Sequence, residues 1–372
     1  MDCHLGANLL PTTMRVRRGV PLGRKRVTLA DVARAAEVSP TTASLVLSGR
    51  GAELRISVAV QERVRLEADA LGYRPNIVSI GLRSGSSRTL GFVSDTVATS
   101  QLAGDMIKGA LTAARQHGFM LFICETEGDP LVERRLLDAM LDRQVDGIIL
   151  ASMFTQTREV PAGIEVPAVL LNALAQQHAP AIPAVVPDER TAGRLAARLL
   201  LDAGHRSIHL VGAGPGADDV PAGTVAGIER LAGIREVLHE EGLELASGHL
   251  LSEWLPPDGW RATRQIIDRF DASRAIITMN DRLAFGAYQA LHEAGLSIPG
   301  DASIVSFDDS PLAQWLRPGL TTFAIPHHDL GRRAVELLIE MITAAGGPPL
   351  APPSVHRVRM PLRERGSVTS NR

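Results

Sequence analysis

Residues Val27–Arg50 read VTLADVARAAEVSPTTASLVLSGR and contain the start signals of two short helices. Thr28 and Asp31 have the spacing of a capping box, and apolar residues follow them at helical spacing. Ser39 followed by Pro40 is a second start signal, an N-cap with a proline in the first helical position. The stretch therefore predicts two helices separated by a tight turn.

The second helix is expected to end at Gly49. Two helices joined by a turn of about three residues cross steeply, which lets the second helix enter the major groove of DNA. Its exposed start carries hydroxyl and methyl groups that can contact phosphates, base edges or thymine methyls. These residues are Pro40, Thr41, Thr42 and Ser44.

Ser57 to Leu71 is a third amphipathic segment, with Val60, Val64 and Leu71 on one face, and Gly72 closes it. Three helices make a minimal core. Spacing alone leaves two interpretations open, a DNA-binding unit and a small helical bundle with polar caps.

Composition narrows the class of protein. The 372 residues suggest two or three domains, and no apolar run approaches the roughly 18 residues of a membrane span. Met1 to Arg26 lacks a secretory signal, so we expect a cytoplasmic location. Cys3 and Cys124 are far apart and fit neither a disulfide framework nor a zinc motif. We expect no metal and no cofactor.

Charge is distributed unevenly along the chain. Residues 1–88 hold 14 Lys and Arg against 7 Asp and Glu, whereas the remainder holds 25 against 34. A basic end beside an acidic remainder is typical of a protein that neutralises phosphates with one part only.

The stretch quoted above, then RIS, then LGYRPNIVSIGLRSGSSRTLGFVSD, resembles the headpiece and hinge of the lactose/galactose repressor (LacI/GalR) family, and the resemblance continues nearly to the C-terminus. It implies that the second helix reads the major groove and that a hinge helix folds on DNA and inserts a leucine into the minor groove. The implied reading positions are Pro40, Thr41, Thr42, Ser44 and Leu45. The implied phosphate contacts are Thr28, Ser57, Tyr73 and Asn76, and the implied wedge is Leu82.

Three positions depart from the family pattern. Leu45 stands where several members have an arginine that can pair with guanine, so the operator cannot be copied from them. Glu37 replaces the usual turn glycine, which at positive φ costs about 1 kcal/mol. Gly81 weakens the hinge helix by about 1 kcal/mol and makes its folding more dependent on DNA.

From Leu90 onward, short apolar runs alternate with amphipathic segments, which predicts parallel sheets covered on both faces. The expected strands are TLGFV, FMLFIC, GIILAS, PAVLLN, SIHLVG, AIITMN and SIVSFDD. This many strands suggests two α/β units, and ligands in such folds bind beyond the carboxyl ends of the strands.

Polar residues follow several of these strands. Each alone is an ordinary helix N-cap, but together they could take both donors and acceptors from the hydroxyls of a sugar or nucleoside. They are Ser94, Asp95, Asn172, Asn280, Asp281, Asp308 and Asp309.

The resemblance implies a two-lobed core like that of periplasmic sugar-binding proteins, with the chain crossing between lobes near Pro187, near Leu320 and after Ala344. It also implies effector contacts from Arg230, in the motif RLAG, and from Trp254. Packing in the core is the alternative explanation for Trp254. The implied effector-binding residues are Ser94, Asp95, Asn172, Arg230, Trp254, Asn280 and Asp308. Ile325, Ala226 and Ala151 replace polar residues of the family pocket.

We therefore expect an α/β protein with a basic N-terminal extension (1–25), a three-helix helix-turn-helix domain (26–73), a hinge (74–88), a two-lobed effector-binding and dimerisation domain of doubly wound parallel sheets (89–363) and a C-terminal tail (364–372). The expected function is a homodimeric transcriptional regulator, more readily a repressor, that binds double-stranded operator DNA and a small carbohydrate effector. It would associate with the nucleoid when bound to its operator and would not contact a membrane. Arg230→Ala should abolish the effector response and spare operator affinity, unless Arg230 belongs to a structural ion pair.

Parts of the sequence also fit two other classes of protein, a dehydrogenase and a plain solute-binding protein. GAGPGA, Gly212 to Ala217, fits the dinucleotide-binding pattern of a dehydrogenase, but a loop follows it where a helix should start. His327 and His328 lack partners at metal-ligand spacing and are expected at the surface. A plain solute-binding protein would need export and no headpiece. We expect no enzyme activity.

Overall fold

The computed structural model describes residues 27–74, 85–100, 103–176, 182–268, 274–344 and 354–369. The chain divides into two compact units, Met1–Ser84 and Gly85–Arg372. The expected N-terminal extension and most of the hinge, including Asn76 and Leu82, lie outside the described residues.

The described part of the first unit is a three-helix domain, with α1 at Leu29–Ala35, α2 at Pro40–Leu47 and α3 at Val58–Ala70. Both predicted caps are present: Thr28 and Asp31 form the capping box of α1, and the Ser39 side chain accepts from Thr42 N at 3.0 Å. Glu37 has a φ of 54° in the turn, as expected where the family has glycine.

The three helices share one small core, built from Val32, Ala33, Ala36, Ala43, Val46, Val64 and Ala68. The prediction that Leu71 faces this core was wrong, because Leu71 is the C-cap of α3 and keeps 39% of its surface exposed. Gly72, at a φ of 64°, then turns the chain away, as predicted.

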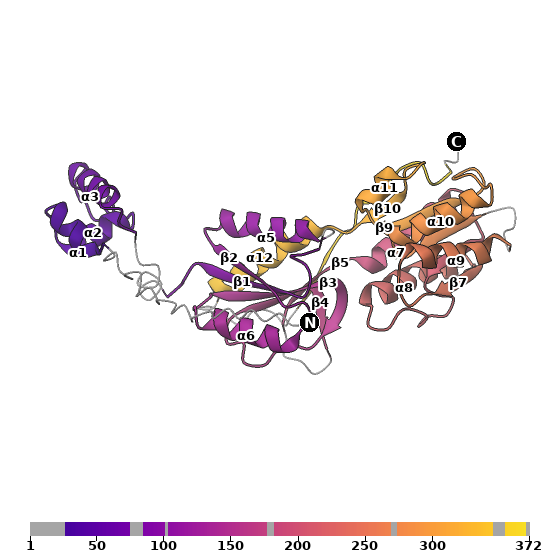
Figure 1. The fold of residues 1–372 in the computed structure, drawn as a ribbon, viewed down its shortest axis with the longest axis horizontal. Helices are drawn as coiled ribbons and strands as arrows, with labels where there is room; N and C mark the ends of the chain where they lie inside the picture. The colour runs from indigo at the N-terminus through magenta and orange to yellow at the C-terminus, as the bar shows by residue number, and fades with distance from the viewer. Residues whose placement is uncertain are drawn as a thin grey trace, which may run out of the picture. The chain divides into compact units, whose positions relative to one another are not determined.

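The second unit consists of two lobes, each built on a six-stranded sheet (Figure 1). The first sheet is parallel throughout, in the order β11-β5-β4-β3-β1-β2. Its strands are β1 (Thr89–Ser94), β2 (Met120–Glu125), β3 (Gly147–Arg158), β4 (Ala168–Ala175), β5 (Ala184–Pro187) and β11 (Val355–Val358). Helices α5 (Gly104–Gln116) and α12 (His327–Ala344) cover one face, and α6 (Pro130–Leu141) covers the other.

The second sheet has the order β12-β10-β9-β8-β6-β7 and is parallel except for its edge strand β12. Its strands are β6 (Ile208–Gly212), β7 (Ser247–Leu250), β8 (Ala275–Thr278), β9 (Ser303–Asp308), β10 (Thr321–Ala324) and β12 (Leu362–Arg363). Its helices are α7 (Glu189–Asp202), α8 (Val225–Glu240), α9 (Pro256–Ile267), α10 (Asp281–Glu293) and α11 (Pro311–Trp315). The predicted doubly wound α/β class is confirmed, and all seven predicted strands are present.

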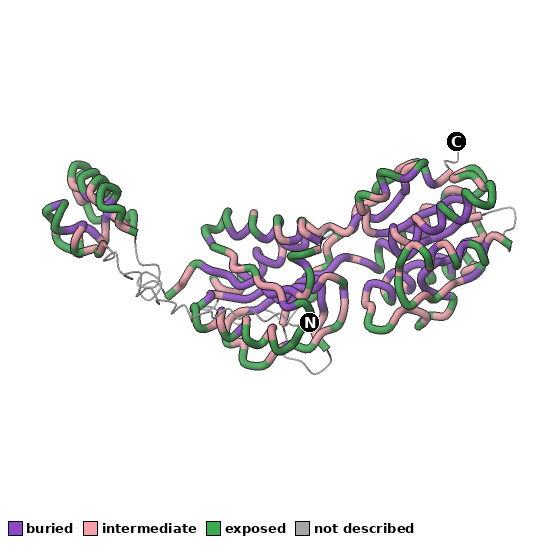
Figure 2. The backbone as a smooth tube through the Cα atoms, viewed as in Figure 1, coloured by how far each residue is buried: buried purple, intermediate pink, exposed green. Residues whose placement is uncertain are grey.

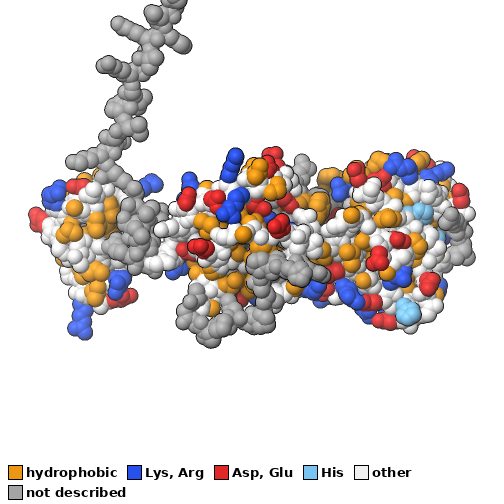
Figure 3. Space-filling view, turned by 90° about the horizontal axis from the view of Figure 1, so that it is seen from below, with side chains coloured by type: hydrophobic (Ala, Val, Ile, Leu, Met, Phe, Trp, Pro, Cys, Tyr) orange, Lys and Arg blue, Asp and Glu red, His pale blue; other side chains and the backbone are white. Residues whose placement is uncertain are grey.

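The buried residues follow the strands through the middle of each lobe (Figure 2). One apolar cluster fills the second lobe, and two clusters lie on opposite sides of the first sheet. On the outside, Lys and Arg alternate with Asp and Glu over the face that Figure 3 shows. No helix in the described ranges combines the length and the apolar character of a membrane span.

The chain passes between the lobes three times. It leaves the first sheet after β5 at Pro187, returns between Ala324 and His327, and passes once more between Val358 and Leu362. The second crossing was expected near Leu320 but lies a few residues later. The chain first forms β10, which still pairs with β9 of the second sheet. No lobe is therefore a continuous segment of chain.

Candidate functional site

A cavity of about 980 Å³ is lined by residues of both lobes. The first lobe contributes residues of α5, β3 and β4, and the second contributes the starts of α7, α8 and α10 together with the end of β9. This is the carboxyl-end edge of both sheets, where the strand pattern predicts ligand binding.

Arg230, on α8, lies on the floor of the cavity and is almost fully buried. Its Nε and Nη2 donate to the two carboxylate oxygens of Glu189 at 2.6 and 3.0 Å, and its Nη1 donates to the Met279 carbonyl at 2.6 Å. Its guanidinium carbon lies 4.6 Å from the centre of the Phe307 ring. Burial opposes the charge of Arg230, but the surrounding carboxylates, Glu189 foremost and then Asp308 and Asp281, together raise the pKa of the guanidinium.

Close helix packing brings Arg230 and Glu189 together. A side chain at Gly193 on α7 would lie 2.3 Å from the Arg230 carbonyl, and one at Gly233 on α8 would lie 2.1 Å from the Arg190 carbonyl. The two glycines let α7 and α8 approach until their backbones touch, which places the start of α7 against Arg230.

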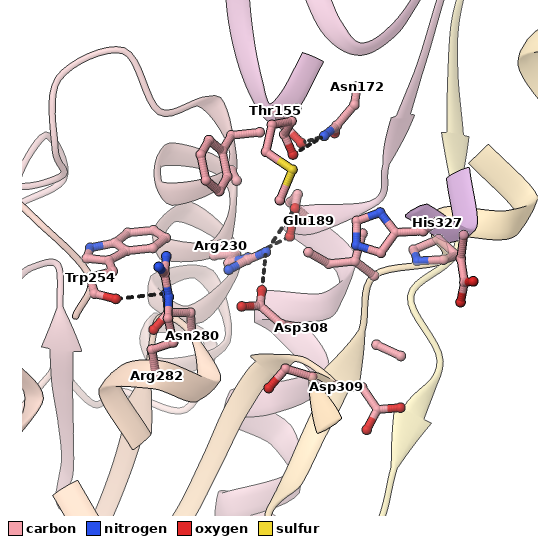
Figure 4. Close-up of a pocket in the computed structure, with 18 of the residues that line it drawn as sticks. Thr155, Asn172, Glu189, Arg230, Trp254, Asn280, Arg282, Asp308, Asp309 and His327 are labelled. Atoms are coloured by element: carbon pink, nitrogen blue, oxygen red, sulfur yellow. Dashed lines mark hydrogen bonds and ion pairs between the residues drawn. The ribbon is translucent and has the colours of Figure 1, made fainter. Parts of the chain in front are cut away.

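Asp308 ends β9 at a φ of 115°, with Oδ1 3.9 Å from Arg230 Nη2 (Figure 4). Burial raises the pKa of this carboxyl to about 8: the attraction of Arg230 opposes the rise, and the neighbouring Asp281 and Glu189 add to it. A carboxyl held in its neutral form can donate a hydrogen bond to a ligand hydroxyl.

Asn172 and Asn280 line the cavity, but their side chains form hydrogen bonds with other atoms of the protein (Figure 4). Asn172 accepts from Thr155 Oγ1 at 2.6 Å and donates to the carbonyls of Ser152 and Met153, where β3 is irregular. Asn280 caps α10 and donates to the Trp254 carbonyl at 3.2 Å. These amides fix the wall of the cavity.

Trp254 lines the cavity and also packs against the core of the second lobe, so the core packing is present and the effector contact stays a prediction. Its indole Nε1 donates to the Gly212 carbonyl at 3.0 Å, which fixes the ring. Ile325 and Ala226 line the same cavity, whereas Ala151 is fully buried and does not.

Ser94 and Asp95 do not line the cavity. Ser94 is buried, with its hydroxyl 3.4 Å from the Cys124 carbonyl. Asp95 accepts from Met153 N at 2.9 Å and so supports the segment beside the cavity. Ser94 ends β1 and Asp95 follows it, as predicted, but Met153 and the next residues of the irregular part of β3 line the cavity instead.

The sequence interpretation missed several lining residues, among them Glu189, Phe154 and Arg282. Glu189 looks like an ordinary acid in the first turn of a helix, so the sequence held no signal for it. His327 was expected at the surface, but it lines the cavity with a buried Nδ1, and burial lowers its pKa to about 4. No group of three or more His, Cys, Asp or Glu in the described ranges could hold a metal ion.

The dehydrogenase motif can be tested directly. Residues 213–224, after β6, form a loop, and α8 begins only at Val225. A pyrophosphate site needs a helix N-terminus immediately after the glycine turn. The geometry therefore does not fit a dinucleotide.

Comparison with known proteins agrees with this two-part organisation. Residues 28–76 match the profile described as bacterial regulatory proteins, lacI family, and residues 200–368 match a periplasmic binding protein-like domain. The transcriptional regulator DegA of Bacillus subtilis is 30% identical over 310 residues, covering 82% of this chain and 88% of DegA. The chain belongs to the lacI family.

Other members of the lacI family align over nearly the whole length. The ribose operon repressor of Escherichia coli (strain K12) is 29% identical over 360 residues, covering 92% of this chain and 99% of that protein. The crystal structure of the Lac repressor dimer bound to operator and the anti-inducer ONPF has the same fold, with a TM-score of 0.74, 23% identity, and coverage of 93% of this chain and 100% of that one.

In this lacI-family chain the expected reading helix α2 has an accessible start. Pro40 and Thr41 are exposed, and Thr42, Ser44 and Leu45 are partly exposed. Thr42 Oγ1 lies 2.8 Å from Ser39 Oγ, so this hydroxyl also belongs to the cap.

The three described residues expected at phosphates lie near helix ends. Thr28 and Ser57 are exposed N-caps of α1 and α3, whereas Tyr73 is half-buried and packs against the headpiece core. The Ser57 side chain makes no capping hydrogen bond. Its hydroxyl is therefore not needed to start α3.

Proposed function

We propose that this lacI-family protein represses transcription by binding operator DNA through α2, and that a small ligand in the cavity changes its affinity for the operator. The observation that carries the proposal is the combination, in one chain, of a helix-turn-helix with an exposed α2 start and a two-lobed core with a cavity that both lobes line. Such a regulator would act on chromosomal DNA and would therefore work in the cytoplasm.

On DNA, Pro40, Thr41, Thr42, Ser44 and Leu45 would face the base edges. Thr28, Ser57, Tyr73 and Asn76 would contact phosphates, and Leu82 would wedge into the minor groove. Because Leu45 offers no hydrogen bond, apolar contact and DNA shape would carry more of the specificity than in members with an arginine.

A single short helix covers too few base pairs for specific recognition, so the active form would be a homodimer on a roughly palindromic site. The two copies would place their α2 helices about one helical turn of DNA apart.

In the cavity, Arg230, Trp254 and Asp308 are the proposed direct ligand contacts. Asn172 and Asn280 would act by shaping the wall, and Ser94 and Asp95 by supporting it. A carbohydrate fits a site with a fixed indole and a neutral carboxyl, and the ribose operon repressor is named for a sugar operon. A ligand that binds one arrangement of the lobes better than another shifts the population toward it, and this shift would change operator affinity.

The test selects operator sequences from a random duplex library and measures binding by fluorescence anisotropy, with and without a panel of sugars, sugar acids, sugar phosphates and nucleosides. We expect a palindromic consensus, a dimer on DNA in sedimentation, and at least one ligand that changes operator affinity. No sequence preference would contradict the DNA-binding role, and a stable monomer on the selected site would contradict the dimer.

A further inference from the structure

The charged side chains that line the cavity are nearly all paired with opposite charges. The pairs are Asp105–Lys108, Glu189–Arg230, Asp309–Arg363 and Asp329–Arg332. Asp308 lies 3.9 Å from Arg230. Within the described part of the chain, Arg282 is the exception, because its guanidinium forms no ion pair at all.

Arg282 occupies an unfavourable place for a cation. It is the second residue of α10, whose N-terminus carries the positive end of the helix dipole. Its Nε is buried and has no hydrogen-bond partner among the described residues. A buried donor without an acceptor destabilises the protein, so an acceptor from outside the chain would remove this cost.

The side chain faces the open space. Arg282 lines the cavity and lies beside Asn280, on the side that Trp254 borders (Figure 4). Asn280 caps α10 and donates a hydrogen bond to the Trp254 carbonyl. These bonds fix the start of α10, which carries Arg282, relative to the backbone of Trp254.

Neither neighbouring carboxyl, Asp281 or Asp308, forms an ion pair with Arg282. Asp281 is fully buried and accepts from Ser310 N at 2.7 Å and from Thr322 Oγ1 at 2.8 Å. Burial, together with nearby Asp281 and Glu189, raises the pKa of Asp308, and this favours the neutral carboxyl even though Arg230 and Arg282 both attract the carboxylate. Among the described lining residues, the cavity therefore presents one guanidinium that no ion pair holds.

We propose that the ligand carries a carboxylate or phosphate group that Arg282 binds, so that the effector is a sugar acid or a sugar phosphate and not a neutral sugar. A planar guanidinium binds two oxygens of such a group at once. The ring or chain of the ligand would then lie against Trp254, within reach of Arg230 and Asp308. This inference rests on the proposed function, since it takes the cavity as the effector site.

The test compares anionic probes with their neutral parents at constant ionic strength, set with chloride. The pairs are D-gluconate and D-glucuronate against D-glucose, and D-ribose 5-phosphate against D-ribose, with inorganic phosphate as a probe of the anion alone. Thermal shift and calorimetry are applied to the full-length wild type, to R282Q, to R282K and to R264Q. Arg264, on α9, is exposed and does not line the cavity, so R264Q is a matched loss of charge.

We expect at least one anionic probe to bind the wild type more tightly than its neutral parent. Its Kd should rise about 10- to 100-fold in R282Q, rise less in R282K, and stay unchanged in R264Q. A preference for the gluconate and glucuronate arm identifies a carboxylate, and a preference for the ribose 5-phosphate arm identifies a phosphate.

Two results would overturn the inference: neutral parents that bind as tightly as the anions, or no anionic probe that stabilises the wild type more than R282Q. Operator binding by the same preparations separates this failure from a failure of the proposed function. If the protein binds its operator but fails the anion test, only the inference of an anionic effector is contradicted. If it shows no sequence-specific DNA binding, the proposed function itself is contradicted.

Discussion

Arg230 and Glu189, which both line the cavity, form a bidentate ion pair, with Nε–Oε2 and Nη2–Oε1 distances of 2.6 and 3.0 Å. The guanidinium that the family resemblance assigns to the ligand is therefore already paired inside the protein. Removal of either partner leaves a buried charge without compensation, which is far more costly than losing a surface pair.

Arg230→Ala should thus lower the free energy of unfolding by about 3 to 5 kcal/mol. The sequence suggested that this variant would lose only its effector response, but the structure contains the ion pair of the structural alternative. Urea denaturation at pH 7 measures the loss. Arg194→Ala, which breaks exposed pairs with Glu236 and Glu240, is the control and should cost less than about 1 kcal/mol.

The double variant Arg230→Ala with Glu189→Ala should be destabilised by much less than the two single changes added together. In the double variant no unpaired charge remains buried, so the two sites should show a coupling of about 1 to 3 kcal/mol. Additive losses in the double-mutant cycle would mean that the two side chains do not depend on each other.

Asp308→Asn should change how stability depends on pH. The pKa of the Asp308 carboxyl in the folded protein is raised from 3.8 to about 8, so its contribution to stability is fully present below about pH 4 and is lost as the pH rises through 8. The wild type should lose stability relative to the Asn variant across that interval, by up to about 1.4 kcal/mol per pH unit. Denaturation curves of both proteins from pH 5 to 9 provide the measurement, and parallel curves would contradict it.

Thr41→Ala should weaken specific DNA binding without affecting the fold. Thr41 is exposed on α2, and losing one hydroxyl and methyl contact should cost about 1 kcal/mol on the selected operator and little on random DNA. Ser39→Ala is the contrasting variant, because it removes the cap of α2 and should destabilise the headpiece by about 1 kcal/mol. Equal losses on both DNAs for Thr41→Ala would exclude a base contact.

Glu37→Gly should stabilise the headpiece by about 0.5 to 1 kcal/mol, because a φ of 54° strains any residue with a Cβ. Gly49→Ala, at a φ of 80°, should have the opposite effect. Amide hydrogen exchange of the headpiece in the full-length protein can compare the two variants. A Glu37→Gly protein that exchanges faster than the wild type would contradict the expectation.

The sequence predicted the headpiece caps and the apolar strands because those signals are local. It did not predict β5, β7, β10, β11 and β12, which are two to four residues long. The segment VHRV of β11 pairs with β5 from about 170 positions away, and no local pattern announces such a partner.

For the cavity, the sequence identified the correct edge of the sheets. Five of the seven residues proposed to bind the effector line it, Asn172, Arg230, Trp254, Asn280 and Asp308. It could not show that the two asparagine side chains form hydrogen bonds within the protein, because their hydrogen-bond partners lie in other segments of the chain. Glu189 and Arg282 were missed for the same reason, since only the fold turns two ordinary first-turn residues toward one space.

The late strands β11 and β12 set the order in which the protein can be completed during its synthesis. β11 forms one edge of the first sheet and β12 one edge of the second, and the two are separated by only a few residues. The ribosome therefore releases the final strand of both lobes at nearly the same moment, after the other described strands of both sheets have been made. The headpiece can fold early, but a nascent chain holds two open sheet edges until β11 and β12 have been made. Chaperones that bind exposed strand edges would act on it during this interval.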